Sequence, residues 1–155
     1  MTISKSQKKD NGHWLFPEQV KIENIFGFVY LIRNRKTNMM YIGKKFVKGT
    51  GKLNRGLESN WKTYTSSSKI INDDIRINGK DHYEFIILEC YTTRGGVGWA
   101  ETWSQCYVEI PSNNHIWYNR FIDKVSWKSS EHITKRHKLR LNKILKEFNV
   151  FSNAT

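Results

Sequence analysis

Two runs of aromatic and β-branched residues, separated by a short polar segment, dominate the hydrophobic pattern of the chain. Residues 27–32 and 39–43 form the apolar runs, and residues 34–38 between them are polar and turn-prone. This pattern predicts a β-hairpin. Because side chains alternate between the two faces of a strand, Tyr30 and Tyr41 can line one surface of that hairpin.

The next segments predict a helix followed by a central strand. The helix is expected over residues 67–79, with a serine cap at its start, Ile71 and Ile75 as its buried stripe, and a glycine stop at its end. Residues 83–88 are long and apolar enough to form a strand in the middle of the sheet.

A second helix is expected after the glycine-rich segment 95–98, which we interpret as a loop, and it should end before Pro111. Its apolar positions recur at helical spacing and comprise Trp99, Trp103, Cys106, Tyr107 and Ile110. Glu101 then projects from roughly the opposite side of this helix.

The two ends of the chain differ in character. The segment from about residue 129 predicts an amphipathic helix, whose apolar stripe comprises Leu141, Ile144, Leu145 and Phe148. The start of the chain has only one short apolar island, residues 14–16, and reads as a flexible arm or a packed strap. The elements together predict an α+β fold, a small three-stranded antiparallel sheet flanked by helices. Its expected parts are an N-terminal arm (1–24), a central domain (25–122) and a basic helical extension (123–155).

Length and charge narrow the function. A chain of 155 residues fits one domain, and its net charge of +12 and pI near 9.8 favour a polyanionic partner, with nucleic acid ahead of an anionic membrane. No apolar run approaches the length of a membrane span, and no apolar signal segment opens the chain, so we expect a soluble, cytoplasmic protein. The spacing of Cys90 and Cys106 matches no zinc motif, and both are interpreted as buried thiols.

Two basic segments are candidates for contact with DNA. In residues 44–62, glycines alternate with cations, as a backbone that approaches phosphates requires, although a solvated surface loop would look similar. The tail helix carries a run of cations without an acid, which is either a solvated face or a surface that follows phosphates. The candidate DNA-binding residues are Lys44, Lys45, Lys48, Lys52, Lys135, Arg136, Lys138 and Arg140.

The tripeptides Phe28-Val29-Tyr30 and Tyr41-Ile42-Gly43 resemble the two motifs that name the GIY-YIG endonuclease superfamily. The second motif is intact, whereas Phe28 replaces the glycine of the first. The order of later segments also agrees, so that the likeness covers roughly residues 26–122, and the segment 61–81 is similar to phage-encoded members related to homing endonucleases.

This resemblance implies a metal-dependent endonuclease that cuts duplex DNA to leave a 5′-phosphate and a 3′-hydroxyl. Tyr30 would be the general base or would position the attacking water, Tyr41 would support the nucleophile or the phosphate, and Tyr64 could share the proton transfer. Glu101 would hold a single Mg²⁺ or Mn²⁺, and Asn119 would close the site. One ion is expected because the sequence lacks the dense acidic clusters of two-metal sites.

One departure from the family pattern concerns the cation that stabilises the phosphate. Asn60 stands where relatives have an arginine, and an amide cannot replace a guanidinium. The candidates to substitute for it are Lys62 and Arg55, which we favour, and Lys44 or Lys45.

Without such a substitute the chain would be a catalytically impaired module that binds nucleic acid, and an adaptor that docks on an acidic protein is a further alternative. A single-site nuclease would have to dimerise or act twice to break both strands. A phage-encoded enzyme would act in the infected host cell.

Overall fold

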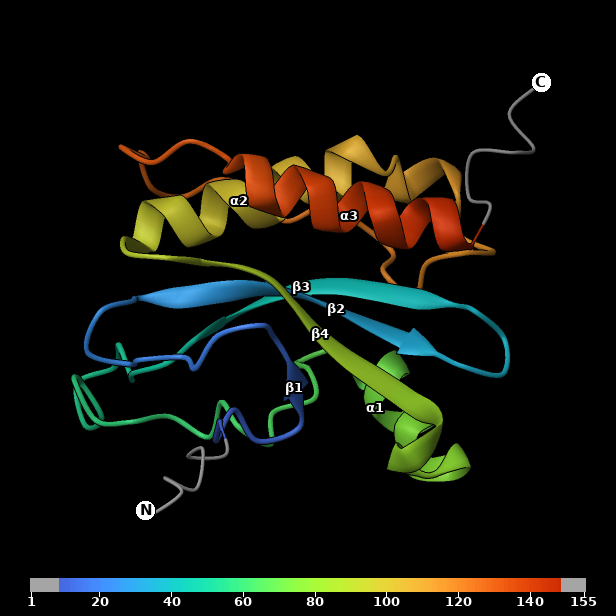
Figure 1. Ribbon diagram of the computed structural model, residues 1–155, viewed down its shortest axis with the longest axis horizontal. Coiled ribbons are helices and arrows are strands. Elements are labelled where there is room, and N and C mark those ends of the chain that lie inside the picture. Colours follow the sequence, from blue (N-terminus) through green and yellow to red (C-terminus); the bar gives the residue numbers. More distant parts are fainter. Residues whose placement is uncertain (1–8, 149–155) are drawn as a thin grey trace, which may run out of the picture.

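A four-stranded sheet lies at the centre of the computed structural model, which describes residues 9–148 (Figure 1). Its strands, in the spatial order β1-β4-β2-β3, are β1 (Trp14–Leu15), β4 (Tyr83–Tyr91), β2 (Gly27–Asn34) and β3 (Met40–Phe46). The α+β class is confirmed, but the sheet has four strands rather than the three expected. The additional strand β1 pairs parallel to β4 and comes from the apolar island at residues 14–16, so this segment is the packed strap rather than the flexible arm of the two alternatives. A strand of two residues is too short to show the alternating pattern by which strands are recognised in a sequence.

Helices cover both faces of this sheet. The three helices are α1 (Lys69–Asn78), α2 (Arg94–Tyr107) and α3 (Lys135–Glu147), with short 3-10 turns at Lys80–His82 and Ile110–Ser112. Figure 1 shows α2 and α3 over one face and α1 on the other. The core accordingly has two parts, one under α2 and α3 and one between the sheet, α1 and the N-terminal segment. Within the described range, no helix is long and apolar enough to cross a bilayer.

The predicted hairpin and the helix after it are confirmed. β2 and β3 pair antiparallel, with Tyr30 opposite Gly43, and Tyr30 and Tyr41 lie on the same face of the sheet. Helix α1 ends at Asn78, and the following Gly79 has a φ of 87°, a value that glycine adopts readily. Ser68 stands at the N-cap position, but its side chain makes no capping hydrogen bond, so the predicted serine cap was wrong. β4 lies between β1 and β2, so the prediction of a central strand is also confirmed.

Helix α2 differs from the prediction in its start and in its buried face. It begins at Arg94, so the glycines taken for a loop form its first turn. A Cβ on Gly95 would lie 1.9 Å from the backbone oxygen of Lys128, which explains why a glycine occupies this turn. The helix buries mainly small and polar residues, and the expected stripe was wrong in part. Trp99, Cys106 and Tyr107 are exposed, whereas Trp103 packs partly buried against the core and Ile110, beyond the helix, is fully buried. The buried residues of the helix are Gly95, Gly96, Val97, Ala100, Glu101, Ser104 and Gln105.

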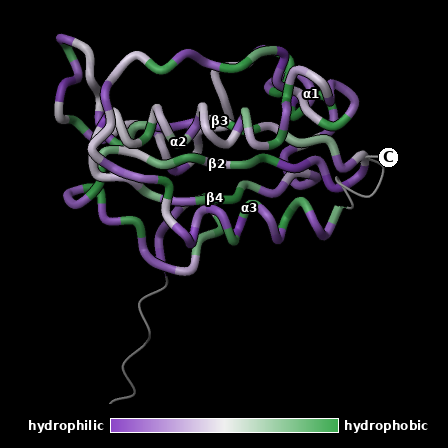
Figure 2. Tube along the Cα trace, turned by 90° about the horizontal axis from the view of Figure 1, so that it is seen from above, coloured by the Kyte–Doolittle hydropathy of each residue, from purple (hydrophilic) through white to green (hydrophobic). Residues whose placement is uncertain are grey.

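Helix α3 packs as its apolar stripe predicted, although it begins at Lys135 rather than near residue 129. Leu141 and Leu145 are fully buried, and Figure 2 shows hydrophobic and hydrophilic positions alternating along the helix. The side chain of Thr134 caps its first turn by accepting a hydrogen bond from the amide of His137. The prediction for the cysteines was wrong in part, because Cys106 is exposed.

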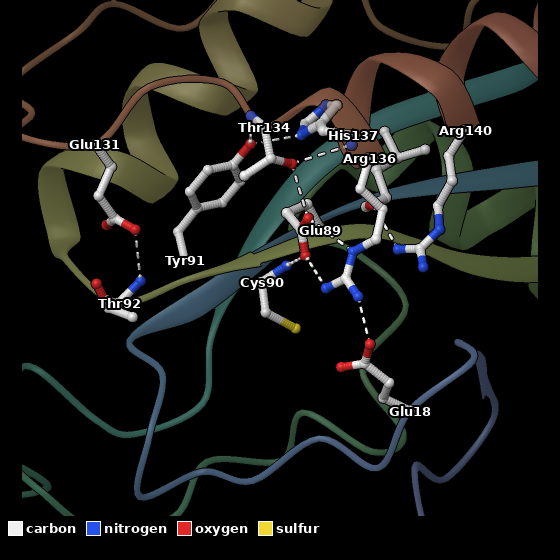
Figure 3. A network of polar contacts seen from close by, with 11 residues as sticks. Glu18, Glu89, Cys90, Tyr91, Thr92, Glu131, Thr134, Arg136, His137 and Arg140 are labelled. Carbon is white, nitrogen blue, oxygen red and sulfur yellow. Dashed lines mark hydrogen bonds and ion pairs between the residues drawn. The ribbon is translucent and has the colours of Figure 1, made fainter.

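His137, which the sequence analysis did not single out, is fully buried and joins three elements (Figure 3). Its Nδ1 lies 2.9 Å from the hydroxyl of Tyr91, and its Nε2 lies 2.7 Å from the hydroxyl of Ser104. The Ser104 hydroxyl donates to the carbonyl of Ala100, so it must accept from Nε2–H, and Nδ1 must accept from Tyr91. Burial lowers the pKa of His137 to about 4, and the ring therefore stays neutral in this network.

Candidate active site

A pocket at the outer edge of β3 gathers most of the predicted catalytic side chains. It is lined by Tyr30, Tyr41, Lys44, Lys45, Phe46, Tyr64, Ser67, Glu101 and Asp123. Because β3 is the edge strand, side chains from both faces of the sheet can meet around it. Tyr41 and Lys45 come from the face that carries α1, and Lys44 extends from the opposite face toward α2.

The three phenols form one group in this pocket. The ring of Tyr30 lies 6.2 Å from that of Tyr41 and 6.2 Å from that of Tyr64, measured between ring centroids. Tyr30 comes from the interior strand β2 and crosses over Gly43 to line the pocket, where a Cβ on Gly43 would lie only 2.5 Å from its hydroxyl. The glycine of the second motif is thus a steric requirement for the placement of Tyr30.

Burial alters the acidity of two of these phenols. The pKa of Tyr30 is raised well above its ordinary value of 10, mainly because the phenol is removed from water, and the other two phenols add to the effect. Burial also raises the pKa of Tyr41. Both hydroxyls are therefore protonated at neutral pH and can donate hydrogen bonds.

Lys45 occupies the space between Asn60 and Tyr64. Its Nζ donates to the Oδ1 of Asn60 at 2.9 Å and lies 4.0 Å from the centre of the Tyr64 ring. Burial lowers the pKa of Lys45. The Asn60 side chain therefore holds the ammonium group of Lys45, which comes from β3, at the pocket.

Glu101 enters the pocket from α2 and is almost completely buried. Its Oε1 forms an ion pair with the Nζ of Lys44 at 2.6 Å, and only 3% of the residue is exposed. Burial raises the pKa of Glu101 to about 7, with Lys44 opposing this shift and Asp123 reinforcing it. Glu101 and Asp123 are the carboxylates of this pocket that could hold a divalent cation.

Asp123 was missed by the sequence analysis, as was the residue that holds it. Its amide donates to the Oε1 of Gln105 at 3.1 Å, and the buried Gln105 donates in turn to the carbonyl of Ile42 at 3.2 Å. Nothing in the local sequence marks either residue, because both act across contacts between distant segments.

Asn119 lies next to the pocket but does not line it. Its Oδ1 accepts from the amide of Ile42 at 3.0 Å, and its Nδ2 donates to the carbonyl of Ile42 at 2.8 Å. The side chain thus pairs with the free edge of β3 as a neighbouring strand would, and holds the Tyr-Ile-Gly segment in place.

Phe28, the departure in the first motif, belongs to the core. It is fully buried, and its ring packs against Trp14 and Trp61 at centroid distances of 5.1 and 6.1 Å. The bulky residue therefore fills the interior behind Tyr30 without entering the pocket.

Two of the proposed substitutes for the arginine are elsewhere. Lys62 forms an ion pair with Asp10 at 2.6 Å on the surface. Arg55 lines a separate pocket together with Lys48 and Arg94. The structure therefore brings Lys44 and Lys45 to the phenols, and it does not bring the two cations that the sequence analysis favoured.

Two of the predicted DNA-binding cations of α3, Arg136 and Arg140, are paired within the protein, as Figure 3 shows. Arg136 forms ion pairs with Glu18 and with the buried Glu89, the latter at 2.6 Å, and Arg140 donates to the carbonyl of Leu88 at 2.9 Å. Both arginines are thereby tied to the sheet and the N-terminal segment. Lys135 and Lys138 remain exposed, as does Lys52 in the loop after β3.

Residues 14–122 match the protein family described as "Putative endonuclease segE, GIY-YIG domain". Comparisons with curated proteins and with solved structures gave no match. The matched range begins at β1, includes all four strands and ends one residue before Asp123. With the family covering most of the chain and its two name-giving tyrosines meeting in one pocket, the chain belongs to the GIY-YIG endonucleases of the segE type.

Proposed function

We propose that this protein is a metal-dependent DNA endonuclease that hydrolyses phosphodiester bonds to 5′-phosphate and 3′-hydroxyl ends. The observation that carries the proposal is the meeting of Tyr30, Tyr41 and Glu101 in one pocket, although they come from two strands and a helix. If Glu101 lay on the solvent-exposed side of α2, its carboxylate would be in water and away from the phenols.

The phenols position the reactants in this proposal. Water must attack phosphorus in line with the departing 3′-oxygen, and a fixed hydrogen-bond partner near the water lowers the cost of reaching that geometry. Tyr30 is rigidly packed and lines the pocket, so its hydroxyl orients the attacking water. Its raised pKa means that it accepts the proton of that water only when positive charge lies close by.

Lys45 supplies that positive charge. It lies over the ring of Tyr64 and is held by Asn60, so its ammonium group faces the same pocket as the phenols. A cation in this place also stabilises the charge on the phosphate oxygens during the reaction. Lys45 thus takes over the role that an arginine at position 60 has in relatives.

The carboxylates of Glu101 and Asp123 fit one Mg²⁺ or Mn²⁺. Such ions prefer oxygen ligands, accept one or two carboxylates and complete their shell with water and phosphate oxygens. No group of three or more histidine, cysteine or acidic side chains in residues 9–148 forms a richer site. When bound, the ion would polarise the scissile phosphate as a Lewis acid. Lys44 pairs with the Oε1 of Glu101, so a bound ion would compete with Lys44 for that oxygen.

Cleavage of supercoiled plasmid tests this proposal directly. Nicked or linear products should appear with Mg²⁺ or Mn²⁺ and not with EDTA, and Glu101→Ala and Tyr30→Phe should abolish them. The ends should be substrates for ligase without prior phosphorylation, which requires a 5′-phosphate and a 3′-hydroxyl.

The same variants separate the nuclease from a binding module. If wild-type protein binds DNA and cuts under no divalent ion, the chain is a catalytically impaired module. If Glu101→Ala cuts as fast as wild type, the metal assignment is wrong.

A further inference from the structure

The loop 120–128, between Asn119 and α3, exposes an unusual set of side chains. Phe121 is 69% exposed and Trp127 is 56% exposed, the highest values among the aromatic residues of the described part of the chain. Cations recur at every fourth position, as Arg120, Lys124 and Lys128, and all three are exposed. Aromatic rings that are exposed to water beside cations are typical of a binding surface.

The backbone of this loop is anchored, so its exposed rings do not belong to a loosely held segment. The hydroxyl of Thr102 donates to the carbonyl of Asp123 at 2.8 Å, and the amide of Asp123 donates to the buried Gln105. At the other end, the carbonyl of Lys128 packs against Gly95 so closely that no Cβ would fit there. A surface fixed in advance binds with a smaller loss of conformational entropy.

The loop adjoins the candidate active site at two points. Asp123 lines the pocket itself. Farther along the loop, the guanidinium of Arg94 lies 4.7 Å from the ring centre of Trp127 and 5.5 Å from that of Phe46, which also lines the pocket. The loop therefore lies beside the pocket.

Exposed rings interleaved with cations fit single-stranded nucleic acid better than they fit a protein or a second copy of this chain. Unpaired bases stack on aromatic rings while cations follow the phosphates. The cores of protein interfaces are poor in charged residues, and a second copy would bring another net charge of +12. Bases inside a duplex are already stacked on each other and offer the rings no free face.

We propose that loop 120–128 binds unpaired bases of DNA beside the cleavage site, with Phe121 and Trp127 as stacking platforms. This inference rests on the proposed action on DNA and specifies its substrate, DNA with an unpaired or distorted segment next to the scissile bond. Mismatched or single-stranded bases present their faces at the lowest cost in unstacking.

Binding measured without catalysis tests the inference. Fluorescence anisotropy in EDTA would compare the full-length protein on a labelled duplex and on the same duplex with a central bubble of mismatches. Wild type should prefer the bubble. Phe121→Leu and Trp127→Ala should each lower affinity for the bubble by about 5- to 150-fold, the range for loss of one stacked base, and change duplex affinity less than twofold.

Matched variants separate stacking from loss of structure. Trp127→Phe keeps an aromatic face and should retain the preference, as should Ile77→Ala, which removes a side chain that is 72% exposed on α1. Phe121→Leu and Ile77→Ala should melt as wild type does, because these side chains are exposed, whereas Trp127→Ala also loses the contact with Arg94, which Trp127→Phe keeps. Loss of the preference in Phe121→Leu together with a lower melting temperature would overturn the stacking interpretation.

Failure of the inference can be told from failure of the proposed function. If wild type cleaves plasmid but Phe121→Leu and Trp127→Ala bind the bubble as wild type does, the loop does not bind bases. Equal losses on both DNAs would also overturn it, since the loop would then contact only the backbone. A wild-type dimer that Trp127→Ala converts to a monomer would assign the surface to a second copy instead.

Discussion

The hydroxyl of Tyr30 lies over Gly43, so close that a methyl group on that glycine would stand 2.5 Å from it. The two residues are direct partners in the pairing of β2 with β3. An interior strand can therefore deliver a side chain to the edge of the sheet, because the edge strand has no side chain at the crossing point. The two motifs therefore depend on each other, because the glycine of the second motif leaves space for the tyrosine of the first.

Replacing Gly43 with alanine should displace the Tyr30 phenol and impair cleavage. A contact of 2.5 Å is far inside van der Waals range, so either the ring or β3 must move. Since a displacement of about 1 Å at a reacting group can cost about 100-fold in rate, kcat for plasmid nicking should fall by about that factor. DNA affinity in EDTA should change little.

Gly98→Ala is the matched control for this substitution. Gly98 lies in α2 and has no atom within 4 Å of its Cβ position, so the added methyl group meets open space. Its nicking rate should equal that of wild type, and its melting temperature should be equal or higher, because alanine favours helix more than glycine does. Wild-type nicking by Gly43→Ala would mean that Tyr30 need not occupy its observed position.

Lys45 and Lys62 offer a paired test of which lysine replaces the family arginine. Lys45 contacts Tyr64 and lines the pocket, whereas Lys62 pairs with Asp10 on the surface. Lys45→Met should lower kcat by about 100- to 1,000-fold, the cost of removing one group that stabilises charge in the transition state. Lys62→Met should stay within about threefold of wild type, apart from a lower salt dependence if Lys62 contacts a phosphate. The reverse ranking would restore the assignment favoured by the sequence.

Local periodicity explains why the hairpin, α1, β4 and the stripe of α3 could be predicted. Strands with a period of two and helices with a period near 3.6 carry their faces in their own residues, and Tyr30 and Tyr41 fell on one face for that reason. The strand β1 could not be found this way, because its two residues are held by pairing with β4, far away in the chain.

The prediction for the buried face of α2 was wrong in part because it assumed that the largest apolar side chains would be the buried ones. Its tryptophans are the largest side chains in the segment, yet the fully buried apolar residues are Val97 and Ala100, and Gly95 and Gly96 lie against the segment 128–131. That reversal carries Glu101 into the pocket rather than into water. The partners of Lys62 and Arg136 were likewise unpredictable, since each is paired with an acid more than 40 positions away.

Arg136 and Lys135 are neighbours in sequence with different expected roles. Arg136 neutralises the buried Glu89, whereas Lys135 is exposed at the start of α3. Arg136→Ala should lower the free energy of unfolding by about 3 kcal/mol, because it leaves a buried carboxylate without its partner. Lys135→Ala should leave stability unchanged and reduce the salt slope of DNA binding by about one unit if it contacts a phosphate. Urea denaturation and salt titration of anisotropy measure the two effects, and equal stability of both variants would contradict this division.

The stability of the protein should fall as pH rises from 4.5 to about 7, because buried Glu101 loses its proton in this range. Burial raises its pKa in the folded state from 4.5 to about 7, so between these values the folded chain holds a proton that the unfolded chain has lost. The contribution of this group to the free energy of unfolding therefore falls as pH rises through that window. Glu101→Gln stays neutral, so its stability relative to wild type should grow from pH 4.5 to 7, by at most about 3 kcal/mol.

Urea denaturation in EDTA at several pH values measures this difference. Lys44 opposes the rise in the pKa of Glu101, so in a Lys44→Met background the gain from Glu101→Gln should continue to grow above pH 7. Cleavage by wild type should fall as pH drops below 7, because Glu101 is then protonated and a protonated carboxyl group binds a cation poorly. If the stability of Glu101→Gln relative to wild type falls as pH rises, the effect of Lys44 on the pKa of Glu101 is larger than the effect of burial. The carboxylate would then already be charged in the free protein.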